Sequence, residues 1–424
     1  VMIIRFDRKG KQQMIADIRV GIPAIGGKSW LGGVSFVELH TKAVAALPTG
    51  ERPKLFLVVT GTDAGNLEHY LPFMSLFNGI ICVGATDAAM PPFTDIPRIY
   101  CADENELFRK IDFYFPASFR VLPRRCAASW IHDFQHRYLP EFFSPQDVAG
   151  RDILCRLVAD HARLVFCTSR AVENDFRKFF PASNAVTRAL PLKVTPEETW
   201  YRGDPSLIQA HYHLPAEFIL CCNQFWAHKN HWRLLAALAL LRRAGRDVHL
   251  VCTGATADYR FPSYFSKLQE YIAALGISDL VHVLGLIPRE HQIQLLRRCL
   301  FVVQPSLFEG LSLIVQECSA LGKAIVLSDL DVHREHEYGI YFDRHSVDDL
   351  AAKLTAVLAV ALPGPDVRRE AEARLQAHTL CTVYARQFCA FVEEAVAMFA
   401  NPGKVPPPWI PTLPGAVVPP PEER

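Results

Sequence analysis

The stretch Pro305-Ser306-Leu307-Phe308-Glu309-Gly310-Leu311-Ser312-Leu313-Ile314-Val315-Gln316-Glu317 follows a short apolar run and leads into an apolar pattern with helical spacing. A buried strand, a glycine-containing turn and a helix start predict a diphosphate site, because free N–H groups and the positive end of the helix dipole point at the anion. Seven residues separate Glu309 from Glu317. We expect Glu309 in the loop and Glu317 about one and a half turns inside the helix. Both carboxylates can then accept hydrogen bonds from hydroxyl groups of one ligand.

Short apolar, β-branched runs alternate with helical patterns along the whole chain, which predicts βαβ units around a mostly parallel sheet. The pattern occurs twice, and a proline-containing, more polar stretch near 190–217 separates the halves. We therefore expect an α/β fold of two Rossmann-like domains facing each other across a cleft, with ligands beyond the carboxyl ends of the strands. The expected strands are 55–60, 79–83, 98–101, 127–131, 164–168, 218–222, 248–253, 280–284, 300–304 and 324–328, and helices are expected at 231–245 and 263–275.

The predicted domain boundaries follow this division. We expect an N-terminal domain over 1–195, a C-terminal domain over 196–375, and a last helix over 376–400 that belongs to a helical pattern beginning near 367. The tail 401–424 carries nine prolines between 402 and 421. Such a tail forms neither helix nor sheet, and it is either a disordered end or a partner-binding segment.

Bulk composition excludes several classes of protein. An apolar fraction of 50% over 424 residues supports two sizeable cores, and a formal net charge of +1 argues against nucleic acid as a partner. The 12 cysteines include no C-x-x-C pair, which disfavours a zinc site, and several lie in apolar runs. No signal-peptide pattern and no stretch near 18 uninterrupted apolar residues is present, so we expect a cytoplasmic protein.

The ordered motifs around the two glutamates resemble those of the family 4 retaining glycosyltransferases, with their E-x7-E motif. Residues 281–285 resemble V-x-F-L-G, residues 305–310 resemble P-S-x-x-E-G, and residues 317–326 resemble E-A-M-A-x-G-x-P-V-V; the similarity spans about 217–342. The resemblance implies the GT-B fold, with the terminal helix crossing back onto the N-terminal domain. It also implies metal-independent, front-face transfer of a hexosyl or deoxyhexosyl group from a nucleoside-diphosphate sugar. The acceptor would be a glycan, a lipid-linked molecule or another hydroxyl compound, in surface polysaccharide biosynthesis, with no cofactor.

The resemblance also implies the roles of residues in the donor site. Glu309 would hold sugar hydroxyls, Glu317 would hold the ribose, and Lys229 would hold the diphosphate. The N–H groups that would assist Lys229 belong to Gly310, Leu311, Ser312 and Leu313.

The loop Asn223–His231 resembles G-R-x-x-x-x-K-G, in which the arginine and the lysine hold the donor diphosphate. Lys229 matches the lysine, but Gln224 stands at the arginine position. Gln224 can donate a hydrogen bond, and His228 or His231 could supply charge. The departure raises an alternative function, a catalytically inactive GT-B protein that binds a nucleotide sugar or serves as a scaffold.

Two segments of the first half complete the expected site. His132, within a segment resembling V-H-D-x-x-x-x-x-x-P-E, would contact the donor sugar or the acceptor; the alternative is a structural histidine. Gly32 and Gly33 precede a helical pattern at 34–47 and resemble the family's first glycine loop, which faces the donor phosphates or the acceptor. Taken alone, these glycines fit a flexible surface loop equally well.

Three other charged segments each have a structural and a functional interpretation. Asp329-Leu330-Asp331 matches a manganese-binding D-x-D, but a polar turn is the expected reading here. Residues 333–336 are expected on a solvated or cleft-edge face. The basic segment 120–125 is either a solvated face or a contact with an anionic membrane surface that presents a lipid-linked acceptor.

Overall fold

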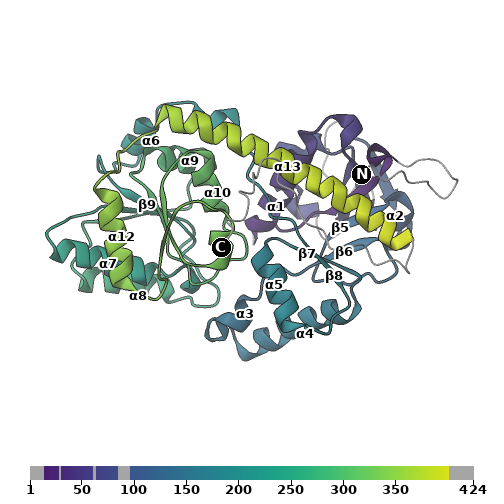
Figure 1. Ribbon diagram of the computed structural model, residues 1–424, viewed down its shortest axis with the longest axis horizontal. Helices are drawn as coiled ribbons and strands as arrows, with labels where there is room; N and C mark the ends of the chain where they lie inside the picture. Colours follow the sequence, from purple (N-terminus) through teal and green to yellow (C-terminus); the bar gives the residue numbers. More distant parts are fainter. Residues whose placement is uncertain (1–13, 28–29, 61–63, 85–95, 401–424) are drawn as a thin grey trace, which may run out of the picture.

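The computed structural model describes residues 14–27, 30–60, 64–84 and 96–400. They form two parallel sheets flanked by helices, one sheet in each half of the chain (Figure 1). The expected α/β architecture with two sheets is therefore confirmed. The predicted tail 401–424 lies outside the described residues.

The N-terminal sheet has eight strands in the order β4-β3-β2-β1-β5-β6-β7-β8. Its strands are β1 (Arg19–Pro23), β2 (Lys54–Thr60), β3 (Gly79–Val83), β4 (Arg98–Cys101), β5 (Phe113–Ser118), β6 (Ala127–Trp130), β7 (Leu164–Cys167) and β8 (Val186–Ala189). Its helices are α1 (Leu31–Ala45), α2 (Glu104–Lys110), α3 (Gln135–Tyr138), α4 (Pro145–His161) and α5 (Arg170–Phe179). The 3-10 segments are η1 (Ile15–Asp17), η2 (Thr49–Glu51), η3 (Ala64–Leu76) and η5 (Pro140–Phe142).

The C-terminal sheet has six strands in the order β11-β10-β9-β12-β13-β14. Its strands are β9 (Ile219–Cys222), β10 (Leu250–Thr253), β11 (Val281–Gly285), β12 (Val302–Gln304), β13 (Ile325–Ser328) and β14 (Ile340–Phe342). Its helices are α6 (Pro205–His211), α7 (His231–Arg243), α8 (Tyr264–Ala274), α9 (Arg289–Arg298), α10 (Leu313–Ala320), α11 (Asp331–Arg334) and α12 (Val347–Leu358). The 3-10 segments are η6 (Glu198–Tyr201) and η7 (Ala227–Lys229).

All the predicted strands are present within about two residues, but the sequence patterns missed β1, β5, β8 and β14. β5 lies in the middle of its sheet although it contains Pro116, a residue that argues against a central strand. The register with β6 shifts between Tyr114 and Ala117, on either side of this proline. β8 and β14, of four and three residues, are the edge strands of their sheets.

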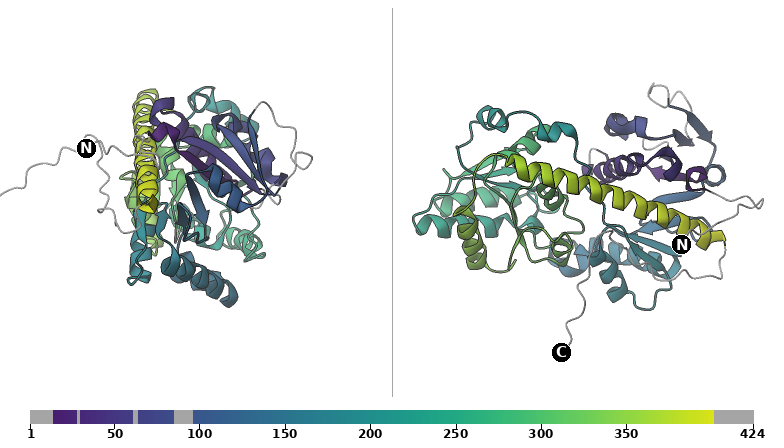
Figure 2. Two further views of the ribbon diagram at one scale, coloured as in Figure 1. Left: turned by 90° about the vertical axis from the view of Figure 1, so that its right-hand side faces the viewer. Right: turned by 45° about the horizontal axis from the view of Figure 1, so that its top comes forward.

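A single helix, α13 (Val367–Ala400), connects the two domains over 34 residues (Figures 1 and 2). Tyr384, Phe388 and Phe391 of α13 belong to the apolar core of the N-terminal domain. The hydroxyl of Tyr384 also lies 2.7 Å from Nδ1 of the buried His40 in α1. The helix therefore crosses back onto the N-terminal domain, and the boundary expected at 375/376 falls inside it.

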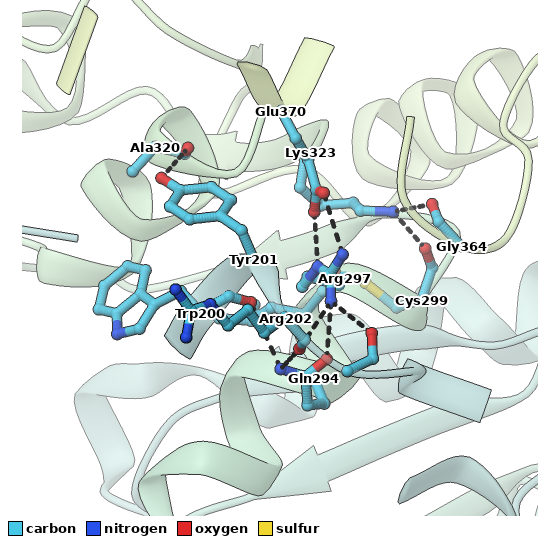
Figure 3. A network of polar contacts seen from close by, with 12 residues as sticks. Trp200, Tyr201, Arg202, Gln294, Arg297, Cys299, Ala320, Lys323, Gly364 and Glu370 are labelled. Carbon is cyan, nitrogen blue, oxygen red and sulfur yellow. Dashed lines mark hydrogen bonds and ion pairs between the residues drawn. The ribbon is translucent and has the colours of Figure 1, made fainter. Parts of the chain in front are cut away.

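The first turn of α13 is anchored to the C-terminal domain by a buried ion pair (Figure 3). Nε and Nη2 of Arg297 donate to the two carboxylate oxygens of Glu370 at 2.7 and 3.0 Å. Nη1 of Arg297 reaches the backbone carbonyls of Arg202 and Gly203 in the interdomain linker at 3.3 and 3.2 Å. One guanidinium thus holds both segments by which the chain passes between the domains.

Candidate functional site

The loop between β12 and α10 gathers three hydrogen-bond donors around Glu309. Oε1 of Glu309 accepts from Nζ of Lys229 at 2.6 Å, from Oγ of Ser306 at 2.6 Å and from Nε2 of Gln304 at 2.8 Å. Burial alone would raise the pKa of Glu309, but the Lys229 ammonium and the Ser306 hydroxyl outweigh it and hold that pKa below its usual value. Glu309 is therefore a carboxylate, fixed in place before any ligand arrives.

Backbone contacts bring Lys229 to Glu309 although 80 residues separate them. Nδ2 of Asn230 donates to the carbonyl of Pro305 at 3.1 Å, and the N–H of Leu307 donates to the carbonyl of His228 at 2.8 Å. Asn230 has a left-handed backbone with φ of 58°, at the position where the resembled motif has glycine. The two loops that follow β9 and β12 consequently form one surface at the carboxyl edge of the sheet.

Glu317 lies inside α10, as expected, and it already has a cationic partner that the sequence patterns did not reveal. Nη2 of Arg289, the first residue of α9, donates to Oε1 of Glu317 at 2.6 Å. The Glu317 side chain is 7% exposed and the Arg289 side chain is 47% exposed. Arg289 also lies over the ring of Trp200, 5.2 Å from its centroid. The one sequence signal that could have indicated Arg289 is its position shortly after a predicted strand, at the start of a helix.

The N-terminus of α10 offers uncapped N–H groups. Ser312 precedes the helix with φ of 63°, and no side chain caps the first turn. Oγ of Ser312 is buried and has no hydrogen-bond partner among the described residues. A strained, uncapped helix start beside Glu309 is suited to an anionic ligand.

His132 belongs to the N-terminal domain and lies across the domain interface from Gly310. Its Nε2 lies 2.7 Å from Oγ of Ser118, and its ring lies 4.8 Å from the ring of Trp30. Burial, with the charge of Arg151, lowers the pKa of His132 to about 3, so the imidazole is neutral near pH 7. A Cβ at Gly310 would lie 3.2 Å from the carbonyl oxygen of His132. The glycine therefore lets the two predicted site segments meet across the domain interface.

Gly32 and Gly33 lie in the first turn of α1 and not in a loop before it, which corrects the expected helix start at 34. A Cβ at Gly33 would come within 2.9 Å of the Trp30 ring, and one at Gly32 within 3.0 Å of its Nε1. The absent side chains leave room for the Trp30 indole against the helix. Direct contact of these glycines with a donor stays a prediction.

Two histidines were expected to supply charge in place of the arginine that Gln224 replaces, and both are buried. His228 is buried, and burial together with the charges of Lys229 and Arg260 holds its pKa well below the usual value. It is therefore neutral and does not supply the charge considered for it, while donor binding by His228 through a hydrogen bond stays a prediction. His231 is buried and stacks on Phe225 with ring centroids 4.3 Å apart, as a core residue would.

Residues 333–336 do not form a solvated face as a whole: Arg334 is exposed, whereas the contact of Glu335 with the other domain fits the cleft-edge alternative. His333 is fully buried, and its Nδ1 lies 2.7 Å from the carbonyl oxygen of Ser328. The carboxylate of Glu335 accepts from the N–H groups of Arg170 and Ala171 at 3.0 and 2.5 Å. Glu335 thus caps a helix of the other domain, a contact that no local pattern could reveal.

Asp329 of the D-x-D sequence is engaged by an arginine. Its Oδ1 lies 3.2 Å from Nη1 of Arg344. Among the described residues, no group of three or more His, Cys, Asp or Glu side chains could hold a metal ion.

A cavity of about 410 Å³ lies elsewhere, between α10, β14 and the start of α13, and none of the predicted site residues lines it.

In the basic segment 120–125, one arginine is paired with a carboxylate and another donates to a neutral amide. Arg120 lies 2.8 Å from Glu104, and Arg125 donates to Asn105 at 2.8 Å. In the part of the chain that the structure describes, no helix is long and apolar enough to cross a membrane. Contact with a membrane surface stays a prediction.

Comparison with known proteins supports the fold. Residues 211–372 match the family model described as glycosyl transferases group 1. The structure is similar to Anabaena HepE solved with UDP and glucose, with a TM-score of 0.61, 17% identity, and coverage of 89% of this chain and 99% of that one. No curated protein matches the sequence.

Two further solved structures show the same likeness. A glycosyltransferase from Rickettsia africae has a TM-score of 0.59 and 13% identity, covering 90% of this chain and 99% of its own. A sucrose-phosphate synthase from Thermosynechococcus elongatus has a TM-score of 0.53 and 14% identity, covering 91% and 98%. The protein therefore has the GT-B fold, as the resemblance implied, whereas membership of family 4 stays a prediction.

Proposed function

We propose that the protein is a retaining, metal-independent glycosyltransferase that uses a nucleoside-diphosphate sugar. The observation that carries this proposal is the pairing of Lys229 with Glu309 just before the uncapped start of α10, the helix that carries Glu317, with Gly310 packed against His132 of the other domain. Two carboxylates that can accept from hydroxyls flank a positive surface that suits a diphosphate. HepE, which shares the fold, was solved with UDP and glucose, and this makes UDP-glucose the first donor to test.

In the proposed reaction, the bond between the anomeric carbon and the phosphate oxygen breaks while a bond to the acceptor oxygen forms on the same face. The acceptor proton passes to the departing phosphate oxygen, so no protein base is required. Lys229 and the N–H groups of α10 stabilise the charge on the leaving diphosphate. Glu309 positions sugar hydroxyls, and Glu317 the ribose. His132, which is neutral, serves as a hydrogen-bond partner and not as a charge.

The transferred group would be a hexosyl or deoxyhexosyl unit, and the acceptor a glycan or lipid-linked hydroxyl compound in surface polysaccharide biosynthesis. These finer points rest on the resemblance of the motifs around Glu309 and Glu317. Lys229 and the N–H groups of α10 supply positive charge without a metal ion, and the Asp329 carboxylate is already paired with Arg344. For this reason the proposal assigns no ion to the reaction.

A turnover assay over a panel of nucleotide sugars and acceptors tests the proposal by counting released nucleotide. We expect acceptor-dependent release, retention of the anomeric configuration by NMR, and full activity in excess EDTA. Loss of activity on chelation that manganese restores would contradict the metal-independent mechanism and draw attention to Asp329 and Asp331.

One observation favours a second candidate, a GT-B protein that binds a nucleotide sugar without turning it over. Gln224 stands where the resembled motif has a phosphate-binding arginine. Tight UDP binding with no turnover of any donor in the panel would support this second candidate over the first.

A further inference from the structure

Hydrogen bonds join the loops that follow β9 and β10 at the carboxyl edge of the C-terminal sheet. The N–H of Phe225 donates to the carbonyl of Ala255 at 2.9 Å, and the N–H of Ala227 to Oδ2 of Asp258 at 3.3 Å. Gly254 has φ of +128°, and a Cβ there would lie 2.3 Å from the carbonyl oxygen of Asn223. The backbone of the second loop therefore presses directly on the loop that carries Gln224.

This second loop brings Arg260 to the residue next to Lys229. Nη2 of Arg260 lies 3.3 Å from Nδ1 of His228, and Nη1 lies 3.4 Å from Oε1 of Gln135 in the N-terminal domain. The Arg260 side chain is 7% exposed. Its guanidinium therefore sits at the domain interface, beside the loop in which the resembled motif places two cations.

Aromatic rings from both domains hold this guanidinium in place. Its carbon lies 5.0 Å from the ring centroid of Phe143, 5.2 Å from that of Trp226 and 5.7 Å from that of Tyr259. Such rings attract a cation and exclude water around it. They do not supply a negative charge, so they orient the guanidinium without neutralising it.

The charge of Arg260 is balanced by one buried carboxylate, that of Asp258, without a direct hydrogen bond between guanidinium and carboxylate. Oδ1 of Asp258 lies 3.5 Å from its Nε, longer than a charge-assisted hydrogen bond, and accepts the backbone N–H of Arg260 at 3.0 Å. Nε is buried and makes no hydrogen bond with the described residues. The contacts to His228 and Gln135 are long and join the cation to uncharged groups. A guanidinium with one N–H group unpaired and two others in long contacts to neutral groups can still bind an anion.

We propose that Arg260 is a further donor-binding residue, the cation that replaces the arginine absent at Gln224 and that binds the donor diphosphate together with Lys229. The inference rests on the proposed function. A guanidinium can bind two phosphate oxygens at once, which neither Gln224 nor neutral His228 can do. Gln135 and Phe143, which contact Arg260 from the N-terminal domain, would link this cation to closure of the two domains over the donor.

Calorimetric titration with UDP and with uridine tests the proposal on the full chain, because only UDP carries the diphosphate. Arg260→Gln is expected to weaken UDP binding roughly 10- to 100-fold, the range for a lost charged hydrogen bond, while uridine affinity stays the same. Arg260→Lys should keep part of the UDP affinity. Arg242→Gln, which removes an arginine paired with Asp279 on the surface of the same domain, is the matched control and should bind UDP like the wild type.

The decisive variant restores the cation at the other position. Gln224→Arg, introduced into the Arg260→Gln protein, should recover most of the lost UDP affinity, which a purely structural arginine would not allow. The proposal is overturned if Arg260→Gln binds UDP normally, if UDP and uridine lose affinity equally, or if the double variant binds no better than Arg260→Gln.

Binding and turnover separate this inference from the proposed function. A protein that loses UDP affinity selectively in Arg260→Gln, yet turns over no donor, would sustain the role of Arg260 and contradict the glycosyltransferase. Turnover of a donor by the wild type, together with unchanged UDP affinity in Arg260→Gln, would support the glycosyltransferase and contradict the role of Arg260.

Discussion

The two glutamates of the site are both largely buried and each paired with a cation at the same distance, but the two cations differ in how far they are exposed. Lys229–Glu309 and Arg289–Glu317 both have nitrogen–oxygen separations of 2.6 Å. In the first pair both side chains are largely buried, at 18% and 10% exposed, and two more donors share the Glu309 oxygen. In the second the arginine is 47% exposed. A buried pair is costly to break from one side, whereas a pair with one partner in water exchanges readily.

This difference implies different parts in one site. The Lys229–Glu309 pair is a fixed element that sets the shape of the site before a ligand binds. The Arg289–Glu317 pair is an exchangeable one, because Arg289 can move into solvent and leave Glu317 free for ribose hydroxyls. The two pairs should therefore contribute differently to turnover, binding and stability.

The largest effect is expected for Lys229→Ala, which should reduce kcat at least about 10²-fold, as does loss of another donor that stabilises an anionic transition state. It should also cost about 3–5 kcal/mol of unfolding free energy, because Glu309 would be left buried without its counterion. Steady-state rates with one identified donor and a urea titration measure the two effects. Lys353→Ala, on an exposed part of α12, is the control. A nearly fully active Lys229→Ala enzyme would show that the diphosphate binds elsewhere.

Glu309→Gln is expected to reduce turnover strongly while leaving UDP affinity almost unchanged, since Glu309 is assigned to the sugar and not to the nucleotide. Its pH dependence is also specific. The pKa of Glu309 is lowered in the folded protein, so its stabilisation is present above the ordinary carboxyl pKa and is lost as pH falls through the folded value. The stability difference between wild type and Glu309→Gln should therefore shrink below about pH 4.5. Urea titrations across this range measure it, and a difference independent of pH would contradict the ionised pair.

The sequence alone predicts one of these pairs far better than the other. Glu309 and Lys229 follow apolar strands in loops that resemble known motifs, and parallel strands place such loops at one edge of a sheet. Arg289 and Arg260 match no motif, because their roles depend on where two loops meet in space. Glu335 shows the same limit, since it caps a helix in the other domain.

Burial is the other quantity that the sequence patterns could not give. His228 in a polar loop looked like a source of charge, but packing under the β12 loop makes it neutral. Gly32 and Gly33 looked like a loop, but they are the helix turn against which Trp30 packs. Apolar periodicity located the strands because it repeats along the chain, whereas the environment of His228 is made by Arg260 and Leu307, which are distant in the sequence.

Glu317→Ala should weaken UDP binding by about 1–3 kcal/mol, the range for a lost charged hydrogen bond. The loss should appear with uridine as well, because the assigned partner is the ribose, and this separates Glu317 from Arg260 and Lys229. Calorimetric titration with both ligands measures it, after circular dichroism has verified that the variant is folded. Unchanged affinity for both ligands would remove Glu317 from the site.

The smallest effect is expected for the stability of Arg289→Ala. The Glu317 carboxylate is itself only 7% exposed, but the arginine that covers it is nearly half exposed, so water can solvate Glu317 once Arg289 is removed, and the loss should cost about 1 kcal/mol, against about 3–5 kcal/mol for Lys229→Ala. Salt should discriminate further, since the screening length falls from about 10 Å at 0.1 M to about 3 Å at 1 M. The difference between wild type and Arg289→Ala should nearly vanish in 1 M NaCl, while that for Lys229→Ala should persist. If instead Arg289→Ala proved as destabilising as Lys229→Ala at both salt concentrations, the Arg289 pair would be part of the fixed framework, and Glu317 could not exchange its partner for a ribose.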